Sequence, residues 1–561
     1  MILIEEQKSI KIPGGTSLFV HFNYDSRIVE IIKQCSVTNY DKKSHVWEVP
    51  YVDLSFLCNA LSTIDDITIK LMDSEVTEKV DSMTLKSFKT IPFDYQREGI
   101  EYGLKHDKFL LLDAPGLGKT LQLIYIAEQL HEQGEIEHCL ILCGVNTLKT
   151  NWKKEIEKHS CLSVRILGER VQKKTGKIVI GSVNDRLEDL KSKLEEFFII
   201  TNIETIRNDD IVKEINSGVN SFDMVVLDEC HCCKSPTASQ TKNLLKLTKA
   251  KHRIGATGTV IVNNPLDAYV PLKWIEAENS TYSNFKYFYC VVGGPFNNII
   301  TGFKNIDVLK SLLEQFSIRR TKDLLNLPPK NIIHEYVDMN DAQSLFYNNI
   351  SNGIIEQVDK VEMNTNTILS MVSRLRQATA CPSALTTENI PSSKIIRACE
   401  LVDEIVQNGE KVVVFSVFKE TLNTMMEILK EYNPLLCTGD IKDSIVSENI
   451  DKFQTQSDYK VMLCTTAKMG VGITLTAASN AIFIDSTWTQ ASNLQCEDRI
   501  YRIGSDRPVF IYYLWAVGTI DEHVKEIVED KSLVGDYIVD SIVPAQLTER
   551  LKSIILDMKN S

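Results

Sequence analysis

The chain contains 561 residues, of which 43% are apolar, and it carries a formal net charge of −13 at pH 7. That length exceeds what a single hydrophobic core supports, so we expect two sizeable domains with accessory pieces. The acidic balance argues against adhesion to nucleic acid through bulk positive charge, while it leaves room for a local basic groove.

The N-terminal sequence, the lengths of the apolar segments and the cysteine spacing predict the cellular compartment of the protein. The opening MILIEEQKSI lacks the basic region, apolar core and cleavage site of a secretory signal, and no segment reaches the length that spans a bilayer. The 14 cysteines are scattered, which favours reduced thiols over a disulfide framework. These features predict a soluble, intracellular, cytoplasmic protein without membrane contact.

The order of apolar and amphipathic segments predicts the fold class. Residues 1–85 mix short strand patterns with two amphipathic helices, which indicates a small α+β module. Beyond it, short apolar runs alternate with helix-length segments in two series: KFLLLDA, HCLILCG, KIVIGS, EFFIITN, DMVVLDEC and HRIGATGT, then KVVVFS, LLCTG, KVMLCTT, NAIFIDS and PVFIYYLWA. Such alternation is typical of buried parallel strands with crossover helices, so we predict an α/β protein with two doubly wound parallel-sheet lobes.

The same reading gives domain boundaries. We expect an accessory module at 1–85, a first lobe with a helical insertion at 86–325, and a helical insertion and linker at 326–395. A second lobe is expected at 396–520, followed by C-terminal helices at 521–561 that pack back on the core.

A glycine-containing turn between a strand and a helix predicts a phosphate-binding loop. Asp113-Ala-Pro-Gly-Leu-Gly-Lys-Thr120 follows KFLLLDA and precedes LQLIYIAEQL. Its glycines let backbone N–H groups turn toward phosphate oxygens at a helix N-terminus. We expect Lys119 to reach the β and γ phosphates of ATP and Thr120 to bind Mg²⁺; Asp113 stands where the general motif has its first glycine.

Two carboxylates end a predicted strand further along the chain. Asp228 and Glu229 follow DMVVL, and the carboxyl edge of a parallel sheet is where ligands bind. Asp228 is the predicted Mg²⁺ holder and Glu229 the residue that orients or deprotonates the attacking water; helix capping is the alternative for such a strand end. The neighbouring Cys230-His-Cys-Cys233 has too close a spacing for a usual zinc site, which favours buried thiols.

A pair of arginines lies near the other end of the chain. Arg499 and Arg502 stand three residues apart in a segment that we interpret as a helix, so they would share one face. A guanidinium suits charge developing on a transferring phosphoryl group. The alternative for each is an ion pair with Glu497 or Asp498.

In order along the chain, these motifs resemble those of the SNF2 family of superfamily 2 DNA-dependent ATPases. FDYQREGI resembles that family's adenine-reading Q motif, LILCGVNTLKTNWKKEI its motif Ia, IITNIETIR its motif Ib and IGATGTVIVNNPLDAY its motif III. FSIRRTKDLLNLPPK resembles the stretch that joins the lobes, and the region from TTAKMGVGITL to DRIYRIGSDRP resembles motifs V and VI. Departures include Val260 in motif III and Ser505 at the end of motif VI.

The resemblance implies roles for further residues. It assigns to the nucleotide Gln96, which would read the adenine, together with Pro115, Gly116, Leu117, Gly118, Gly472 and Gln495. It implies DNA contacts at Asn151, Trp152, Thr201, Asn202, Thr465, Thr466 and Trp488. Core packing is the alternative for both tryptophans, because tryptophan is usually mostly buried.

The N-terminal module is similar to the HARP domain of annealing helicases, through FNYDSRIVEIIKQC, WEVP and a second helix. That resemblance implies branched or forked DNA as the substrate. The combined prediction is a monomeric, Mg²⁺-dependent and DNA-stimulated ATPase that translocates on duplex DNA without sequence preference. Remodelling or annealing of forked or branched DNA is the further activity that the resemblance implies. The alternatives are a strand-separating superfamily 2 helicase, a P-loop kinase or metabolic ATPase that needs no second lobe, and a DNA-binding scaffold without hydrolysis.

Overall fold

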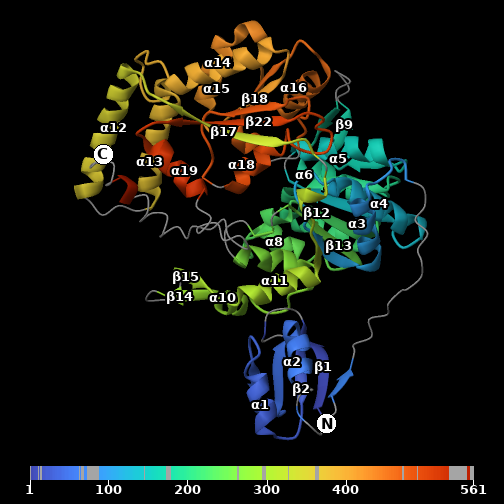
Figure 1. The fold of residues 1–561 in the computed structure, drawn as a ribbon. Helices are drawn as coiled ribbons and strands as arrows, with labels where there is room; N and C mark the ends of the chain where they lie inside the picture. The colour runs from blue at the N-terminus through green and yellow to red at the C-terminus, as the bar shows by residue number, and fades with distance from the viewer. Residues whose placement is uncertain are drawn as a thin grey trace. The chain divides into compact units, whose positions relative to one another are not determined.

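The fold is given by a computed structural model (Figure 1). The structure describes residues 2–9, 12, 16–61, 64, 69–72, 88–144, 146–171, 178–258, 260–261, 265–293, 299–325, 327–360, 365–469, 473–488, 490–529 and 553–555. These residues fall into two compact units. The first comprises Met1–Ala114, Gly118–Val145 and Trp152–Thr321, and the second comprises Pro115–Leu117, Asn146–Asn151 and Lys322–Ser561.

The N-terminal residues form a mixed five-stranded sheet in the order β3-β4-β2-β1-β5, with the α+β character that the sequence predicts. Alternation in β1 buries Ile2 and Ile4, which pack with Val20, Val49 and Leu57 in the core of this module. Its elements are β1 (Ile2–Lys8), β2 (Thr16–His21), α1 (Ser26–Ile32), β3 (Asn39–Asp41), β4 (Val46–Pro50), α2 (Leu54–Leu61) and β5 (Ile69–Met72).

The first lobe is built on a seven-stranded sheet in the order β16-β6-β13-β12-β7-β11-β8, and every neighbouring pair is parallel. Parallel strands need crossover connections, which the amphipathic segments supply. The strands are β6 (Lys108–Leu111), β7 (His138–Cys143), β8 (Val164–Ile166), β11 (Phe198–Asn202), β12 (Phe222–Asp228), β13 (His252–Ala256) and β16 (Ser317–Ile318).

Helices connect the strands of this sheet. They are α3 (Asp94–Lys105), α4 (Lys119–Glu132), α5 (Asn146–His159), α6 (Val183–Lys191), α7 (Asp209–Ser217) and α8 (Ser239–Leu244). A further segment follows β13 and contains α9 (Tyr269–Trp274), α10 (Tyr282–Tyr289), the antiparallel hairpin of β14 (Cys290–Gly293) and β15 (Ile299–Phe303), and α11 (Ile306–Gln315).

The second lobe contains a six-stranded parallel sheet in the order β17-β22-β21-β18-β20-β19. Its strands are β17 (Lys330–Val337), β18 (Val412–Ser416), β19 (Leu435–Cys437), β20 (Val461–Thr465), β21 (Asn480–Phe483) and β22 (Val509–Ala516). With the first sheet, this confirms the prediction of two parallel-sheet α/β lobes.

Helices cover both faces of the second sheet, as Figure 1 shows for α14 and α15 on one side and α13 and α19 on the other. Alternate residues of β18 divide between the two cores: Val412 and Val414 face α14 and α15, whereas Val413 and Phe415 face α13 and α19. The helices are α12 (Asp341–Lys360), α13 (Thr365–Ala380), α14 (Ser393–Gln407), α15 (Lys419–Ile428), α16 (Asp443–Thr455), α17 (Thr466–Met469), α18 (Gln490–Glu497) and α19 (Ile520–Glu529).

Two segments differ from the sequence predictions. KIVIGS was expected in the main sheet, but β10 (Ile178–Ile180) pairs antiparallel with β9 (Glu169–Val171) in a separate ribbon. The connection between them is too short for a crossover helix, so parallel pairing is unavailable. Residues 330–337 were predicted to lie in a helical insertion, yet they form β17 of the second sheet. This strand lies at the edge of the sheet and has one neighbouring strand, and half of its residues are exposed.

The C-terminal prediction is described only in part. The helix α19 packs Ile520 and Val524 into the second lobe, and Ile554 and Ile555 join the same core. Residues 530–552 and 556–561 lie outside the described residues. Within the parts of the chain that the structure covers, no helix is both long enough and apolar enough to cross a bilayer.

A buried ion pair ties three helices of the second lobe together. Lys394 Nζ on α14 lies 2.7 Å from Asp521 Oδ2 on α19, with side chains 1% and 4% exposed. Asp521 also accepts hydrogen bonds from Thr379 Oγ1 on α13 and from the backbone N–H of Ala516.

Replacing Lys394 by methionine should therefore destabilise the second lobe by about 3–5 kcal/mol, because Asp521 keeps a buried charge without its cation. Urea unfolding followed by circular dichroism measures this loss. The matched control is Lys419→Met, whose ion pair with Asp440 has side chains 44% and 55% exposed and should change stability by less than about 1 kcal/mol. Equal unfolding curves for the two variants would contradict the role of the pair.

Candidate active site

Four elements of the first lobe deliver polar residues to one edge of its sheet. The strands β16, β6, β13 and β12 are consecutive neighbours and all run in the same direction. The carboxyl end of β16 leads into Arg320, and that of β6 leads into the loop that starts at Asp113. The strand β13 leads into Thr257, and β12 ends in Asp228, which Glu229 follows. Ligands of open parallel sheets bind at this edge, so the fold gathers these groups where a nucleotide would bind.

The predicted phosphate loop has the backbone that such a loop needs. Gly116 and Gly118 adopt φ values of 87° and 76°, a left-handed region that residues with a Cβ rarely enter. Gly118 directly precedes the 14-residue helix α4, so the loop ends at a free helix N-terminus. Lys119 begins the helix and its Nζ donates to the carbonyl oxygen of Asp113 at 2.8 Å. Backbone, helix end and cation fit a bound triphosphate.

Gln96 on α3 lies against this loop. Its side chain is 3% exposed, and its Oε1 accepts the backbone N–H of Phe93 at 3.0 Å. A Cβ at Gly118 would collide with the Gln96 amide nitrogen, so the glycine leaves room for the glutamine. The structure thus brings Gln96 to the phosphate loop, and its role in reading adenine stays a prediction.

Asp228 receives a hydrogen bond from a tryptophan that we had expected to contact DNA. Trp152 Nε1 on α5 donates to Asp228 Oδ2 at 2.8 Å, and the Trp152 side chain is only 2% exposed. Desolvation and the neighbouring charge of Glu229 raise the pKa of Asp228 to about 6, whereas the Trp152 hydrogen bond and the charge of Lys119 act to lower it. The cation of the loop is thus near enough to the acid of β12 to favour its ionised form.

Glu229 is held by two partners and by an uncommon backbone. Its φ of 51° lies in the left-handed region, which costs of order 1–3 kcal/mol for a residue with a side chain. Glu229 Oε2 lies 3.3 Å from His231 Nδ1 and accepts from Thr257 Oγ1 at 3.3 Å. Burial acts to lower the pKa of His231, but hydrogen bonds with Cys232 and Glu229 raise it to about 10. A cationic imidazole therefore orients the carboxylate that we expect to act on water.

The arginine segment of the second lobe differs from its prediction. The helix α18 ends at Glu497, and Arg499 and Arg502 lie in turns rather than on one helical face. The backbone leaves the helical pattern because Arg499 N–H donates to Cys496 and the Arg499 carbonyl accepts the N–H of Leu475 at 2.7 Å. Arg499 is 7% exposed, and Arg502 Nη1 donates to Thr474 Oγ1 at 2.8 Å.

The acids beside the arginines have other partners. Glu497 Oε2 pairs with Lys330 Nζ at 2.7 Å, and Asp498 forms an ion pair with Lys322. Lysines of the segment that joins the two sheets thus contact both acids. Gln495, predicted to contact the nucleotide, lies half-buried on α18, and Gly472 lies outside the described residues.

Some of the residues predicted to contact DNA have buried side chains, and others have half-buried side chains. Thr201 has no exposed surface and Trp152 almost none, so neither side chain offers a surface for DNA in this structure. For Trp152 this burial matches the core-packing alternative. Thr465 ends β20 at the carboxyl edge of the sheet and Thr466 begins α17; they are 8% and 6% exposed. Asn151, Asn202 and Trp488 are half-buried and remain the accessible candidates.

Local interactions fix two of these candidates. Asn202 Oδ1 accepts from Arg186 Nη1 at 2.9 Å, while its amide nitrogen donates to Glu204. The guanidinium carbon of Arg376 stands 4.8 Å from the centroid of the Trp488 ring. Sequence patterns gave no signal for the partners Arg186 and Arg376, because each of these arginines lies on a helix that does not contain its partner.

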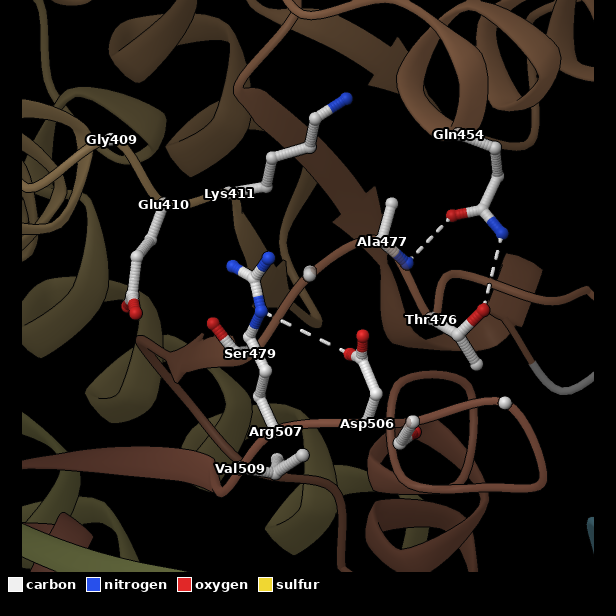
Figure 2. Close-up of a pocket in the computed structure, with 13 residues that line it drawn as sticks. Gly409, Glu410, Lys411, Gln454, Thr476, Ala477, Ser479, Asp506, Arg507 and Val509 are labelled. Atoms are coloured by element: carbon white, nitrogen blue, oxygen red, sulfur yellow. Dashed lines mark hydrogen bonds and ion pairs between the residues drawn. The ribbon is translucent and has the colours of Figure 1, made fainter. Parts of the chain in front are cut away.

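A separate pocket of about 430 Å³ lies in the second lobe (Figure 2). It is lined by residues that precede β18, β21 and β22, including Lys411, Ser479 and Arg507, and Gln454 closes it by accepting the backbone N–H of Ala477. The amino ends of the strands form this wall. None of the predicted ATP residues lines the pocket, so it is distinct from the candidate site.

Comparison with known families matches most of the chain. The SNF2-related domain matches residues 95–384, a little over half of the chain, and the helicase conserved C-terminal domain matches residues 393–504. The two domains together indicate an ATP-hydrolysing enzyme.

The chain is also similar to curated relatives and to a solved structure. The chain is 28% identical to an uncharacterized ATP-dependent helicase of Mycoplasma pneumoniae, over 90% of the chain and 47% of the relative. It is 25% identical to a DNA annealing helicase and endonuclease of Bos taurus, over 80% of the chain and 41% of the relative, so it spans less than half of either protein. A Sulfolobus solfataricus SWI2/SNF2 ATPase core in complex with dsDNA is 25% identical, with 85% of this chain and 99% of that chain covered and a TM-score of 0.38.

Replacing Trp152 by phenylalanine should move the acidic limb of the pH profile of ATP turnover upward by roughly one pH unit. The hydrogen bond favours the ionised form of Asp228, whose pKa is about 6, so its loss raises the pKa further and a higher pH is needed to ionise the acid. Measuring kcat/KM for ATP between about pH 5 and 8 tests this shift. The control is Trp47→Phe in the N-terminal module; superimposable profiles for Trp152→Phe and the unmodified protein would contradict it.

Proposed function

Because the chain belongs to the SNF2-related family, we propose that it is a DNA-stimulated ATPase that translocates on duplex DNA. One observation supports the hydrolytic step above all others. The phosphate loop, Asp228 and Glu229 leave one edge of a single parallel sheet, and the charge of Lys119 acts on Asp228. This is the arrangement that a nucleotide hydrolase needs.

Each group has a part in the proposed reaction. The loop amides and Lys119 bind the phosphates, and Gln96 contacts the base end of the nucleotide. Thr120 and Asp228 would hold Mg²⁺, which neutralises phosphate charge when bound. Glu229, oriented by His231 and Thr257, accepts the proton of the attacking water.

Arg499 and Arg502 complete the proposed site. A guanidinium stabilises charge on the transferring phosphoryl group because it stays ionised and offers a planar set of donors. Supplying these cations from the second lobe makes hydrolysis depend on how the two lobes are arranged. ATP binding and product release then change that arrangement, and this cycle drives movement along DNA.

DNA binding is proposed to rest on backbone contacts. Asn151, Asn202 and Trp488 have accessible surface, and Thr465 and Thr466 lie at the carboxyl edge of the second sheet. Contacts of this kind supply affinity without sequence preference and weaken as salt rises. They are compatible with the net charge of −13, because only the groove needs a favourable local charge.

A strand-separating helicase is the second candidate. The antiparallel pair of β14 and β15, which follows α10 in the first lobe, is the feature that favours it, since a β-hairpin is an element that can divide two strands. Displacement of an annealed oligonucleotide, compared with displacement of a triplex-forming strand, separates the two functions. Translocation without strand separation releases the triplex strand only.

The N-terminal module is proposed to direct the enzyme to forked or branched DNA. Its five-stranded sheet and two helices have their own core, and the matched Bos taurus relative is named a DNA annealing helicase. An enzyme that anneals forks needs an element that distinguishes a junction from plain duplex.

Arg502→Ala should lower ATP turnover by about 10³ to 10⁵, the usual contribution of an arginine that stabilises the transferring phosphoryl group. A malachite-green phosphate assay with saturating duplex DNA measures the rate. Arg507→Ala is the matched control, because this arginine lies five residues away with a side chain 68% exposed. A loss below about threefold for Arg502→Ala would remove its assignment.

Deleting residues 1–85 should weaken the preference for forked over linear duplex DNA while leaving basal ATP turnover largely intact, because the predicted catalytic groups lie in the two lobes. Fluorescence anisotropy with fork and duplex of equal length gives the ratio of dissociation constants. Retained basal turnover is the control for folding of the lobes. An unchanged ratio would reject the proposed role of the module.

A further inference from the structure

A buried arginine lies where the chain leaves the first lobe. Arg320 follows β16, the strand beside β6, and its side chain is 8% exposed. Arg320 Nε donates to Asp113 Oδ1 at 2.9 Å and Arg320 Nη2 donates to Asp113 Oδ2 at 2.6 Å, a bidentate pair. The Arg320 carbonyl also accepts the N–H of Ala114 at 2.9 Å. The exit of the lobe is thus fastened to the first residues of the phosphate loop.

The acid in this pair is the residue that departs from the general loop motif. Asp113 stands at the first glycine position and has no exposed surface. Gln122 on α4 bridges the pair: it accepts from Arg320 Nη2 at 2.7 Å and donates to Asp113 Oδ2 at 2.9 Å. Because aspartate stands in place of glycine, the loop contains a buried carboxylate, and both of its oxygens accept hydrogen bonds. The cation that pairs with it comes from the C-terminal end of the lobe's sequence.

The same guanidinium reaches the helix that carries Gln96. Its central carbon stands 5.5 Å from the centroid of the Tyr95 ring. A Cβ at Gly99 would collide with Gln122 and with Arg320, so the glycine makes room for both. Arg320 therefore contacts the helix before the loop, the head of the loop and the helix after it.

Two residues further on, a lysine is fastened to the arginine segment. Lys322 forms an ion pair with Asp498, and its Nζ donates to the carbonyl oxygen of Tyr501 at 2.9 Å. Asp498 directly precedes Arg499 and is 8% exposed; Tyr501 directly precedes Arg502. Lys322 thus contacts the residue directly before each of the two arginines.

A second lysine supports this anchor. Lys330 pairs with Glu497 at 2.7 Å, and Glu497 also accepts the Tyr513 hydroxyl at 2.7 Å. Both lysines lie over the Tyr501 ring, at 5.2 Å and 5.6 Å from its centroid. The acids beside the arginines are therefore occupied by cations of the connecting segment.

Covalent geometry links the two anchors. Fully extended backbone spans at most about 3.3–3.6 Å per residue, so the Cα atoms of Arg320 and Lys322 cannot separate by more than roughly 7 Å. Asp113 and Asp498 are buried, which makes loss of either cation costly because the remaining charge has no water around it. A displacement at one anchor that exceeds this span must move the other anchor or break an ion pair.

We propose that Arg320, Thr321 and Lys322 form a strap that transmits changes at the phosphate loop to the arginine segment, with Arg320 and Lys322 as positioning residues. This proposal rests on the proposed ATPase function. Nucleotide binding at the loop then sets the position of Arg499 and Arg502. The change passes through the Arg320–Asp113 ion pair, Thr321 and the Lys322–Asp498 ion pair.

Steady-state ATP hydrolysis by the full-length chain with saturating duplex DNA tests the strap. Lys322→Gln should lower kcat by about 10²-fold, the effect of a misplacement near 1 Å, and leave KM for ATP within about twofold. Arg320→Gln should lower kcat similarly. The double variant should be no slower than the slower single variant, because both changes interrupt one connection. Lys246→Gln is the matched control, since Lys246 pairs with Asp209 through side chains 57% and 80% exposed.

Charge reversal separates positioning from general folding. Lys322→Asp should reduce kcat, and adding Asp498→Lys should restore at least about a tenth of the original rate, because the pair re-forms with opposite orientation. Thermal unfolding of each variant reports stability independently of rate.

The outcomes distinguish the two proposals. Absence of turnover in the unmodified protein refutes the proposed function and the strap with it. Turnover in the unmodified protein with multiplicative losses in the double variant, or no rescue by the reversed pair in a protein of normal stability, overturns the strap alone.

Discussion

Parallel pairing of four neighbouring strands is the constraint on which the first lobe depends. Because β16, β6, β13 and β12 all run in one direction, their carboxyl ends open at one edge of the sheet. Four segments distant in sequence therefore meet there, each ending in a polar residue that a continuous apolar strand could not contain. Antiparallel pairing of any one strand would send its terminal group to the opposite edge.

Much of this arrangement could be predicted from the sequence because its signals are local. Apolar runs of four to seven residues marked most strands of both sheets, and the loop from Asp113 to Thr120 was recognisable from its strand and helix neighbours. The sequence could not separate β10 from the main sheet, since its apolar run is the same as that of a parallel strand. The exposed alternation of β17 likewise gave too little apolar signal.

Side-chain partners were the least predictable part. For Trp152 the resemblance implied a DNA contact, with core packing as the alternative; the structure shows its indole N–H donating to Asp228. The helix expected to carry Arg499 and Arg502 stops at Glu497, because a backbone hydrogen bond to Leu475 and ion pairs with distant lysines outweigh helical propensity. Contacts between residues more than 100 positions apart carry no local pattern. The sequence therefore predicted roles for single motifs, whereas the structure shows which side chains of different motifs contact each other.

The pairing of β17 with β22 has a consequence for biosynthesis. The first strand of the second sheet bonds along its whole length to the last, and Trp515 Nε1 donates to His334 Nδ1 across 181 residues. While the ribosome is still adding the intervening segment, β17 has no partner and presents an open strand edge. The second lobe can therefore close only late in translation, and until then this edge is open to pairing with other chains.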